Sequence, residues 1–360
     1  MPLYDNAIPE GERLMTICNA CRYCEGYCAV FPAMERRRQF TGADLDYLAN
    51  LCHNCAECYY ACQYAPPHEF AVNVPKALAE IRLQSYKKFT RPRPLAKLFD
   101  HQGLVAAVVI VLGLLLGTTR ANRFVAGGNF YAVISHRAML LGFGLASALV
   151  VSAWLAGFVR FWNESGEGFA TLLRPRALAR AINDVLHLKY LSNGGTGCTY
   201  PTEHHSQSRR WFHHLTFYGF MLCFASTCVA AIYDNFLGWK APYPLLSLPV
   251  VLGTLGGAGL LIGPAGLAAL KLRRNRIVTD PTQDSMDLTF IALLFASAAT
   301  GLVLLALRDT PEMSGFLVLH LAVILALFAM LPYGKFVHGI YRTAALVRYA
   351  VERMRPQARR

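Results

Sequence analysis

Two cysteine runs near the N-terminus decide how the rest of this sequence is interpreted. They read Cys18-Asn-Ala-Cys21-Arg-Tyr-Cys24-Glu-Gly-Tyr-Cys28 and Cys52-His-Asn-Cys55-Ala-Glu-Cys58-Tyr-Tyr-Ala-Cys62. Together they hold eight of the eleven cysteines in a chain of 360 residues. Each cysteine of the second run stands 34 residues after its counterpart in the first, so the two runs form an internal repeat.

The spacing within each run indicates an iron–sulfur centre. Three thiolates at three-residue spacing surround one corner of an iron–sulfur cube, and the fourth, four residues further on, reaches the other cube, as in bacterial two-cluster ferredoxins. We therefore expect two [4Fe–4S] clusters. The expected ligands are Cys18, Cys21, Cys24 and Cys62 for one cluster, and Cys52, Cys55, Cys58 and Cys28 for the other. The proline that usually follows the fourth cysteine is replaced by Ala29 and Gln63.

Two other uses of paired cysteines compete with this interpretation. Disulfides would suit a secreted domain, but the stretch from Met1 to Met15 has no apolar core and predicts no secretory signal. Structural zinc sites use Cys-x-x-Cys pairs set well apart, without the middle cysteine of each run. Since thiolate clusters need a reducing compartment, the N-terminal domain is expected in the cytoplasm.

The composition indicates a membrane protein. Hydrophobic residues make up 54% of the chain and the mean hydropathy is +0.32. Lys and Arg (35) outnumber Asp and Glu (22), but they fall mostly between apolar runs, which favours a lipid bilayer and no nucleic acid as the partner. Six apolar stretches are long enough for spanning helices, at about 98–117, 133–159, 213–233, 245–270, 288–307 and 316–338.

These features predict a mainly α fold in four parts. They are a ferredoxin-type helical domain with two clusters (1–90), a linker (91–97), a six-helix transmembrane bundle (98–340) and a basic tail (341–360). The linker is expected because Arg91-Pro-Arg-Pro94 interrupts any helix. Three of the connections carry 7, 4 and 7 Lys or Arg, whereas those on the opposite side carry 2, 1 and 1. The positive-inside rule then places both termini and the clusters in the cytoplasm.

Histidines inside apolar spans are candidate functional residues. His320 and His338 are 18 residues apart, which in one continuous helix is five turns, so both would face the same side near opposite surfaces of the bilayer. His213 and His214 are expected level with His338, and His136 level with His320. Cross-helix pairs at two depths would suit b haems held by two histidines each, with His214 as the alternative to His213. The competing interpretation is that these histidines anchor helix ends at the membrane interface.

The remaining candidates receive simpler interpretations. Surface or loop positions are expected for His53, His68, His101, His187, His204 and His205. Cys198, Cys223 and Cys228 are expected to be small buried or loop residues. The glycine-rich stretch 194–198 lacks the Lys-Ser/Thr of a phosphate-binding loop and predicts a turn.

The order of a two-cluster domain, a linker and six spans resembles the tricarballylate utilization protein B family (TcuB, also called CitB) over essentially the whole length. It is also similar to the C-terminal half of the fused protein CobZ. The motifs that carry the resemblance are the cysteine runs, the stretch 209–220 (RRWFHHLTFYGF) and the stretch 332–338 (PYGKFVH). The stretch 332–338 is similar to the end of the last helix in the haem-bearing gamma subunit of respiratory nitrate reductases. The partner helix there supplies two histidines ten residues apart, whereas Cys223 stands ten after His213 here, so a second haem would need His136.

The resemblance implies an electron-transfer subunit of the bacterial inner membrane. Its partner would be an FAD-dependent tricarballylate dehydrogenase, whose FADH2 it reoxidises through the two clusters and one or two b haems to the membrane quinone pool. The chain has no G-x-G-x-x-G after a strand, so the flavin is expected on the partner. Two alternatives remain: a membrane anchor for another dehydrogenase or a heterodisulfide-reductase-like complex, and a redox sensor or structural protein that binds zinc.

Overall fold

The computed structural model describes residues 7–121, 130–192, 197 and 205–355. All the long elements in these residues are helices, which confirms the predicted mainly α fold. The glycine-rich stretch 194–198, apart from Gly197, and His204 lie outside the described residues.

The N-terminal domain is built from short helices. They are α1 (Ala7–Cys21), α2 (Val30–Met34), α3 (Gly42–Leu51), α4 (Glu57–Tyr60) and α5 (Val74–Phe89). Local chemistry sets their starts: Thr41 and Asp44 form a reciprocal cap on α3, and the Asn73 side chain accepts from the Lys76 amide at the start of α5. Burial of apolar side chains such as Leu14, Leu45 and Ile81 holds the helices together around one core.

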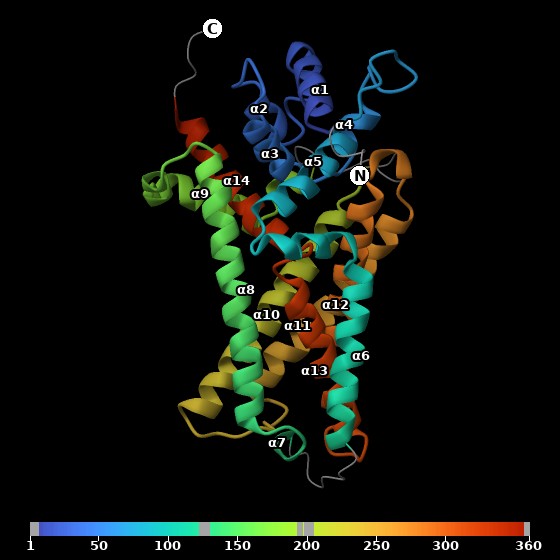
Figure 1. Ribbon diagram of the computed structural model, residues 1–360, viewed down its shortest axis with the longest axis vertical. Helices are drawn as coiled ribbons and strands as arrows, with labels where there is room; N and C mark the ends of the chain where they lie inside the picture. Colours follow the sequence, from blue (N-terminus) through green and yellow to red (C-terminus); the bar gives the residue numbers. More distant parts are fainter. Residues whose placement is uncertain (1–6, 122–129, 193–196, 198–204, 356–360) are drawn as a thin grey trace.

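Six long helices form the bundle below this domain (Figure 1). They are α6 (Gln102–Ala121), α8 (His136–Glu164), α10 (Ser208–Asn235), α11 (Leu248–Leu272), α12 (Pro281–Ala306) and α13 (Met313–Met330). Within the described residues, five are long and apolar enough to cross a membrane. Helix α6 adds a sixth crossing if it and the short helix η1 (Arg93–Asp100), which meets it at 100°, form one bent span. The chain is therefore a multi-pass membrane protein, as the hydropathy predicted.

The two ends of the bundle differ in their contacts. We call the end that meets α1–α5 the near end and the opposite one the far end. At the near end Phe161 and Trp162, the last turn of α8, join the core of the N-terminal domain, and the Asn73 side chain donates to the carbonyl of Ile277 in η5 (Arg276–Val278). At the far end the Arg308 guanidinium, just after α12, donates to the carbonyl of Tyr243, before α11. Helix α14 (Val337–Met354) also lies at the near end (Figure 1).

Glycines bring α10 and α11 into close packing. A Cβ atom at Gly219 would stand 2.9 Å from the carbonyl oxygen of Gly256, and one at Gly263 would stand 2.5 Å from the Thr216 hydroxyl. Small residues at such crossings let two helix backbones approach inside a membrane, where packing rather than water exclusion drives helix association.

The last predicted span is not one continuous helix. Helix α13 ends at Met330, and α14 (Val337–Met354) begins only after a turn over 331–336. Neighbouring helices hold this turn, since the Trp154 indole donates to the carbonyl of Leu331 and stacks on Phe336, and the Gln102 side chain donates to the carbonyl of Tyr333. The argument that placed His320 and His338 on one face of an unbroken helix was therefore wrong.

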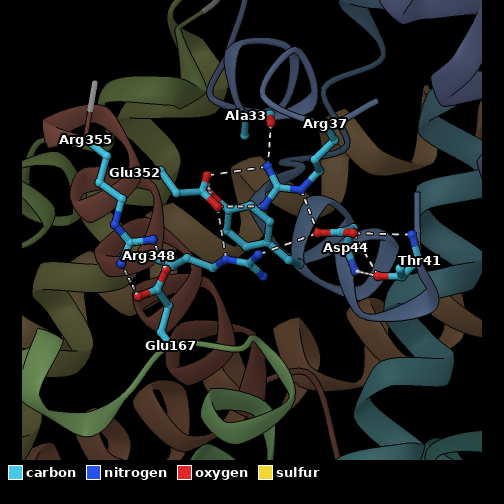
Figure 2. Close-up of polar contacts among 9 residues, drawn as sticks. Ala33, Arg37, Thr41, Asp44, Glu167, Arg348, Glu352 and Arg355 are labelled. Carbon is cyan, nitrogen blue, oxygen red and sulfur yellow. Dashed lines mark hydrogen bonds and ion pairs between the residues drawn. The ribbon is translucent and has the colours of Figure 1, made fainter. Parts of the chain in front are cut away.

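Residues 341–354 are not a basic tail. They belong to α14, whose apolar side chains, Leu346 and Val351 among them, are buried in the core of the N-terminal domain. Two of the basic residues that suggested a tail pair with acids: Arg348 with Asp44 and Glu352, and Arg355 with Glu167, which precedes α9 (Pro175–Leu186). Figure 2 shows Arg348 beside Glu352 and Asp44, and Arg355 on Glu167. The sequence misled because helical amphipathicity, rather than net charge, determined where this segment packs.

Candidate metal and cofactor centres

The first cysteine run lies where α1 ends. Cys18 and Cys21 stand in its last turn, Arg22 adopts a left-handed conformation with φ of 58°, and the chain then turns back through Cys24. A cavity of about 200 Å³ opens between this turn and the second run. Its lining cysteines are Cys18, Cys21 and Cys24 of the first run and Cys58 and Cys62 of the second. The fourth cysteine of the second run thus faces the first three of the first run.

The second cysteine run encloses a smaller cavity of about 20 Å³. Its lining cysteines are Cys52, Cys55, Cys58 and Cys28. Asn54, between Cys52 and Cys55, has a φ of 51°, and Ala56, between Cys55 and Cys58, has a φ of 67°. This left-handed conformation is unusual for residues other than glycine. These two residues turn the backbone so that successive thiols point to one centre.

The thiols of both sets are buried close to one another. Burial, and then the neighbouring Cys24, Cys62 and Cys21, raise the pKa of Cys18 to about 12. Burial, followed by Cys55 and Cys52, also raises the pKa of Cys28 well above its ordinary value. Thiols crowded in this way lose their protons readily only when a metal cation binds them, and iron would supply that charge. Within the described residues, no group of three or more His, Cys, Asp or Glu side chains is placed to hold a single metal ion.

His213 and His338 are brought together at the near end of the bundle. Their ring centres are 6.3 Å apart and the rings are nearly perpendicular, at 76°. The Nδ1 atom of His338 lies 2.6 Å from the carbonyl oxygen of Lys335, so Nε2 is the nitrogen with which this ring would bind a metal. Nδ1 of His213 is buried and has no hydrogen-bond partner among the described residues. A metal held about 2 Å from each of two imidazole nitrogens puts the ring centres roughly 6 Å apart, so this pair fits an iron ligated on both sides.

The other candidate histidines have different surroundings. His214 turns away from this pair and stacks on Tyr218 at 5.7 Å. His320 lies inside the bundle with its Nδ1 3.0 Å from the Thr300 hydroxyl. His136 is at the far end, where its Nε2 lies 2.5 Å from a carboxylate oxygen of Asp234. His136 and His320 therefore contact different residues, Asp234 and Thr300, and Nε2 of His136 is already paired with a carboxylate.

Arginines that the sequence analysis did not single out join the second cysteine run to the histidine pair. Arg209 of α10 donates to the carbonyls of His53 and Asn54. Arg342 of α14 donates to the carbonyls of Asn50 and Cys52 and to Nδ1 of His53. His53 was expected at the surface, but burial, and then Arg342, hold its pKa well below the ordinary value, so it accepts as a neutral imidazole.

One sequence signal was available for these arginines. Arg209 precedes His213 by four residues, and Arg342 follows His338 by four, so each arginine lies one helical turn from a histidine and on the same helix face. The same two helices therefore present guanidinium groups to the cysteine domain and imidazoles to each other.

Comparison with known proteins places this architecture among relatives. The chain matches the family model described as "Citrate utilization protein B" over residues 90–359, and the model described as its Fer4-like domain over residues 11–88. It is 48% identical over 354 residues to citrate utilization protein B of Escherichia coli, an alignment that covers 96% of this chain and 93% of the relative. No solved structure matches significantly.

Proposed function

The chain belongs to the citrate utilization protein B family, and from this premise we propose that it is a membrane electron-transfer subunit that takes electrons from a flavoprotein and delivers them to quinone. Its Fer4-like N-terminal domain suggests an iron–sulfur role, and its helices make it a membrane protein. One observation carries the proposal: Arg209 and Arg342 donate to the loop of the second cysteine set, and each lies one helical turn from a histidine of the His213–His338 pair.

The proposal assigns two [4Fe–4S] clusters to the N-terminal domain. The four cysteines around the larger cavity would hold one cluster, and those around the smaller cavity would hold the other. In support, Cys62 of the second run lines the larger cavity beside three cysteines of the first run, and Cys28 of the first run lines the smaller cavity beside three of the second. Two-cluster ferredoxins exchange one ligand between their runs in this way, and Cys58 here lines both cavities. When bound, these clusters supply one-electron redox centres.

The proposal assigns one b haem to the near end of the bundle. His213 and His338 would be its axial ligands, since their separation suits an iron between them and Lys335 orients one of the rings. A second haem on His136 and His320 would require His136 to release Asp234, which argues for a single haem.

The proposed partner is an FAD-dependent tricarballylate dehydrogenase in the cytoplasm of a bacterium. Its FADH2 gives up two electrons and two protons, and the quinone takes up two of each. The larger cavity is where we place the partner, because aromatic side chains beside it are exposed; Tyr23, which lines it, is 67% exposed. The near end would face the cytoplasm of the inner membrane, with both termini, because the basic connections gather there.

Anaerobic purification of the chain in detergent, with iron, sulfide and haem assayed on one sample, tests the proposal. We expect about eight non-haem irons and one haem per chain, from two four-iron clusters and one ligand pair. The reduced flavoprotein should then reduce a quinone analogue only when this chain is present. Zinc in place of iron would overturn the redox function, and clusters without haem would restrict it to the N-terminal domain.

A further inference from the structure

Three arginines of the membrane part converge on the loop that carries the first two cysteines of the second run. Arg209 comes from α10, Arg342 from α14, and Arg274 follows α11 and donates from its guanidinium to the Asn54 side chain at 2.5 Å. These segments are far apart in the sequence, so only the assembled bundle brings the three guanidinium groups to one loop.

The hydrogen bonds of these arginines do not neutralise their charge. In the part of the chain that the structure describes, their acceptors at this loop are backbone carbonyls, the Asn54 amide oxygen and the neutral His53 ring. Asp284 and Asp287 act on Arg274 from a distance, but both already pair with Lys271. A guanidinium group stays protonated at neutral pH, so all three arginines are charged.

Arg209, Arg274 and Arg342 are partly buried, and positive charges gathered in such a place without a matching carboxylate are costly unless an anion lies nearby. Four thiolates and a [4Fe–4S] core carry net negative charge, and that charge grows by one when the cluster is reduced. Nearby positive charge therefore stabilises the reduced form more than the oxidised form and raises the reduction potential. By contrast, one arginine, Arg22, lines the larger cavity, and its Nε donates to the Asn19 carbonyl.

We propose that Arg209, Arg274 and Arg342 are positioning residues that raise the reduction potential of the centre held by Cys52, Cys55, Cys58 and Cys28 above that of the other centre. An electron that arrives at the solvent-facing cluster is then drawn to the one beside His213 and His338, where it leaves toward the membrane. This inference rests on the proposed function, because it requires both clusters to be present.

The test is an anaerobic redox titration of the detergent-purified full chain. The electron paramagnetic resonance signals of the reduced clusters and the absorption of the haem monitor the titration. Signals are assigned first, since the Cys55→Ser variant should lose the signal of the arginine-flanked cluster and Cys21→Ser that of the other. The comparison is then between wild type, Arg342→Gln, Arg342→Lys and Arg209→Gln. Arg210→Gln is the matched control, because Arg210 adjoins Arg209 but donates to the carbonyl of His187.

We expect Arg342→Gln to shift the one-electron equilibrium of the flanked cluster about tenfold toward the oxidised form, which corresponds to 59 mV. The other cluster, and both clusters in Arg210→Gln, should keep their potentials, and Arg342→Lys should restore most of the shift. An unmoved potential at full iron and sulfide content overturns the inference while the proposed function stands. A shift of the haem alone would also overturn it. If the Arg342→Gln variant does not load clusters, the potential of the flanked cluster in Arg209→Gln tests the inference in its place. A wild type without clusters overturns both this inference and the proposed function.

Discussion

His213 and His338 face each other with ring centres 6.3 Å apart, although one lies in the first turns of α10 and the other at the start of α14. Each has an arginine one turn away that donates to the loop of the second cysteine run. A shift of either helix would therefore change both the histidine pair and the contact with the cysteine domain. This shared support makes the junction the place where variants should be most informative.

Replacing His213 or His338 with Ala should remove the haem, because an iron held from both sides loses one of its two ligands. His214→Ala is the matched control, since the neighbouring ring stacks on Tyr218 instead. Haem is measured per chain by the pyridine haemochrome spectrum, with non-haem iron as the internal standard. Haem loss in His214→Ala but not in His213→Ala would show that the wrong histidine has been assigned.

Replacing Cys55 or Cys21 with Ser should each lower the non-haem iron from about eight to about four per chain, because the two cavities hold separate clusters. Cys228→Ser serves as the control, since this exposed cysteine of α10 belongs to neither set. Iron and acid-labile sulfide report the result. Full iron content in the Cys55 variant would exclude that thiol as a ligand.

Replacing Tyr23 with Ala should weaken binding of the partner flavoprotein about tenfold, the effect of removing one good aromatic contact worth roughly 1–2 kcal/mol. The side chain is 67% exposed beside the larger cavity, so its loss should leave cluster content unchanged. Trp239→Ala is the control, because that exposed aromatic lies beyond α10 at the far end. Titration calorimetry with the flavoprotein measures the dissociation constant. Equal affinities of the two variants would place the docking surface elsewhere.

In the wild type, titration of Asp46 should lower the free energy of unfolding as the pH rises, and replacing Asp46 with Asn should abolish this decrease. Burial raises the pKa of Asp46 to about 6, although Lys88 opposes the shift, while the unfolded chain has a value near ~3.9. The folded state therefore binds this proton more tightly, so the contribution to stability is complete below about pH 4 and is lost as the pH rises through about 6. It amounts to at most about 3 kcal/mol. Thermal unfolding midpoints measured between pH 4.5 and 7.5 should rise for Asp46→Asn relative to the wild type as the pH increases. Midpoints of the two proteins that change in parallel with pH would contradict this.

Replacing Glu352 with Gln should destabilise the docking of α14. This carboxylate accepts from Arg37 at 2.6 Å, from Arg348 at 3.1 Å and from the Tyr47 hydroxyl at 3.0 Å (Figure 2). Breaking a largely buried charge network of this kind costs about 3–5 kcal/mol. Asp309→Asn is the control, since its exposed pair with Arg308 is worth about 1 kcal/mol or less. Thermal unfolding and limited proteolysis of the N-terminal domain measure the difference, and equal midpoints would mean that α14 docks through apolar contacts alone.

Some features were accessible to sequence reasoning because they depend on short-range spacing. The cysteine runs predicted two sets of four thiols, and the eight side chains line two neighbouring cavities, with Cys58 lining both. Their assignment as cluster ligands stays a prediction. The apolar stretches predicted the crossing helices, since a bilayer demands about 20 apolar residues for each. The turn at 331–336 escaped this reasoning, because Pro332 and Gly334 stand in a stretch that is otherwise apolar enough to continue the span.

The sequence by itself therefore determined the kinds of ligand, the helical class and the membrane segments of this protein. Only the tertiary structure decided that His213 rather than His214 faces His338, that His136 pairs with Asp234, and that Arg209, Arg274 and Arg342 converge on one loop. The physical reason is that spacing along one helix specifies which face a side chain occupies, whereas the partner of that face comes from a segment distant in the chain. Glycine-mediated packing of the helices and the docking of α14 bring such segments together.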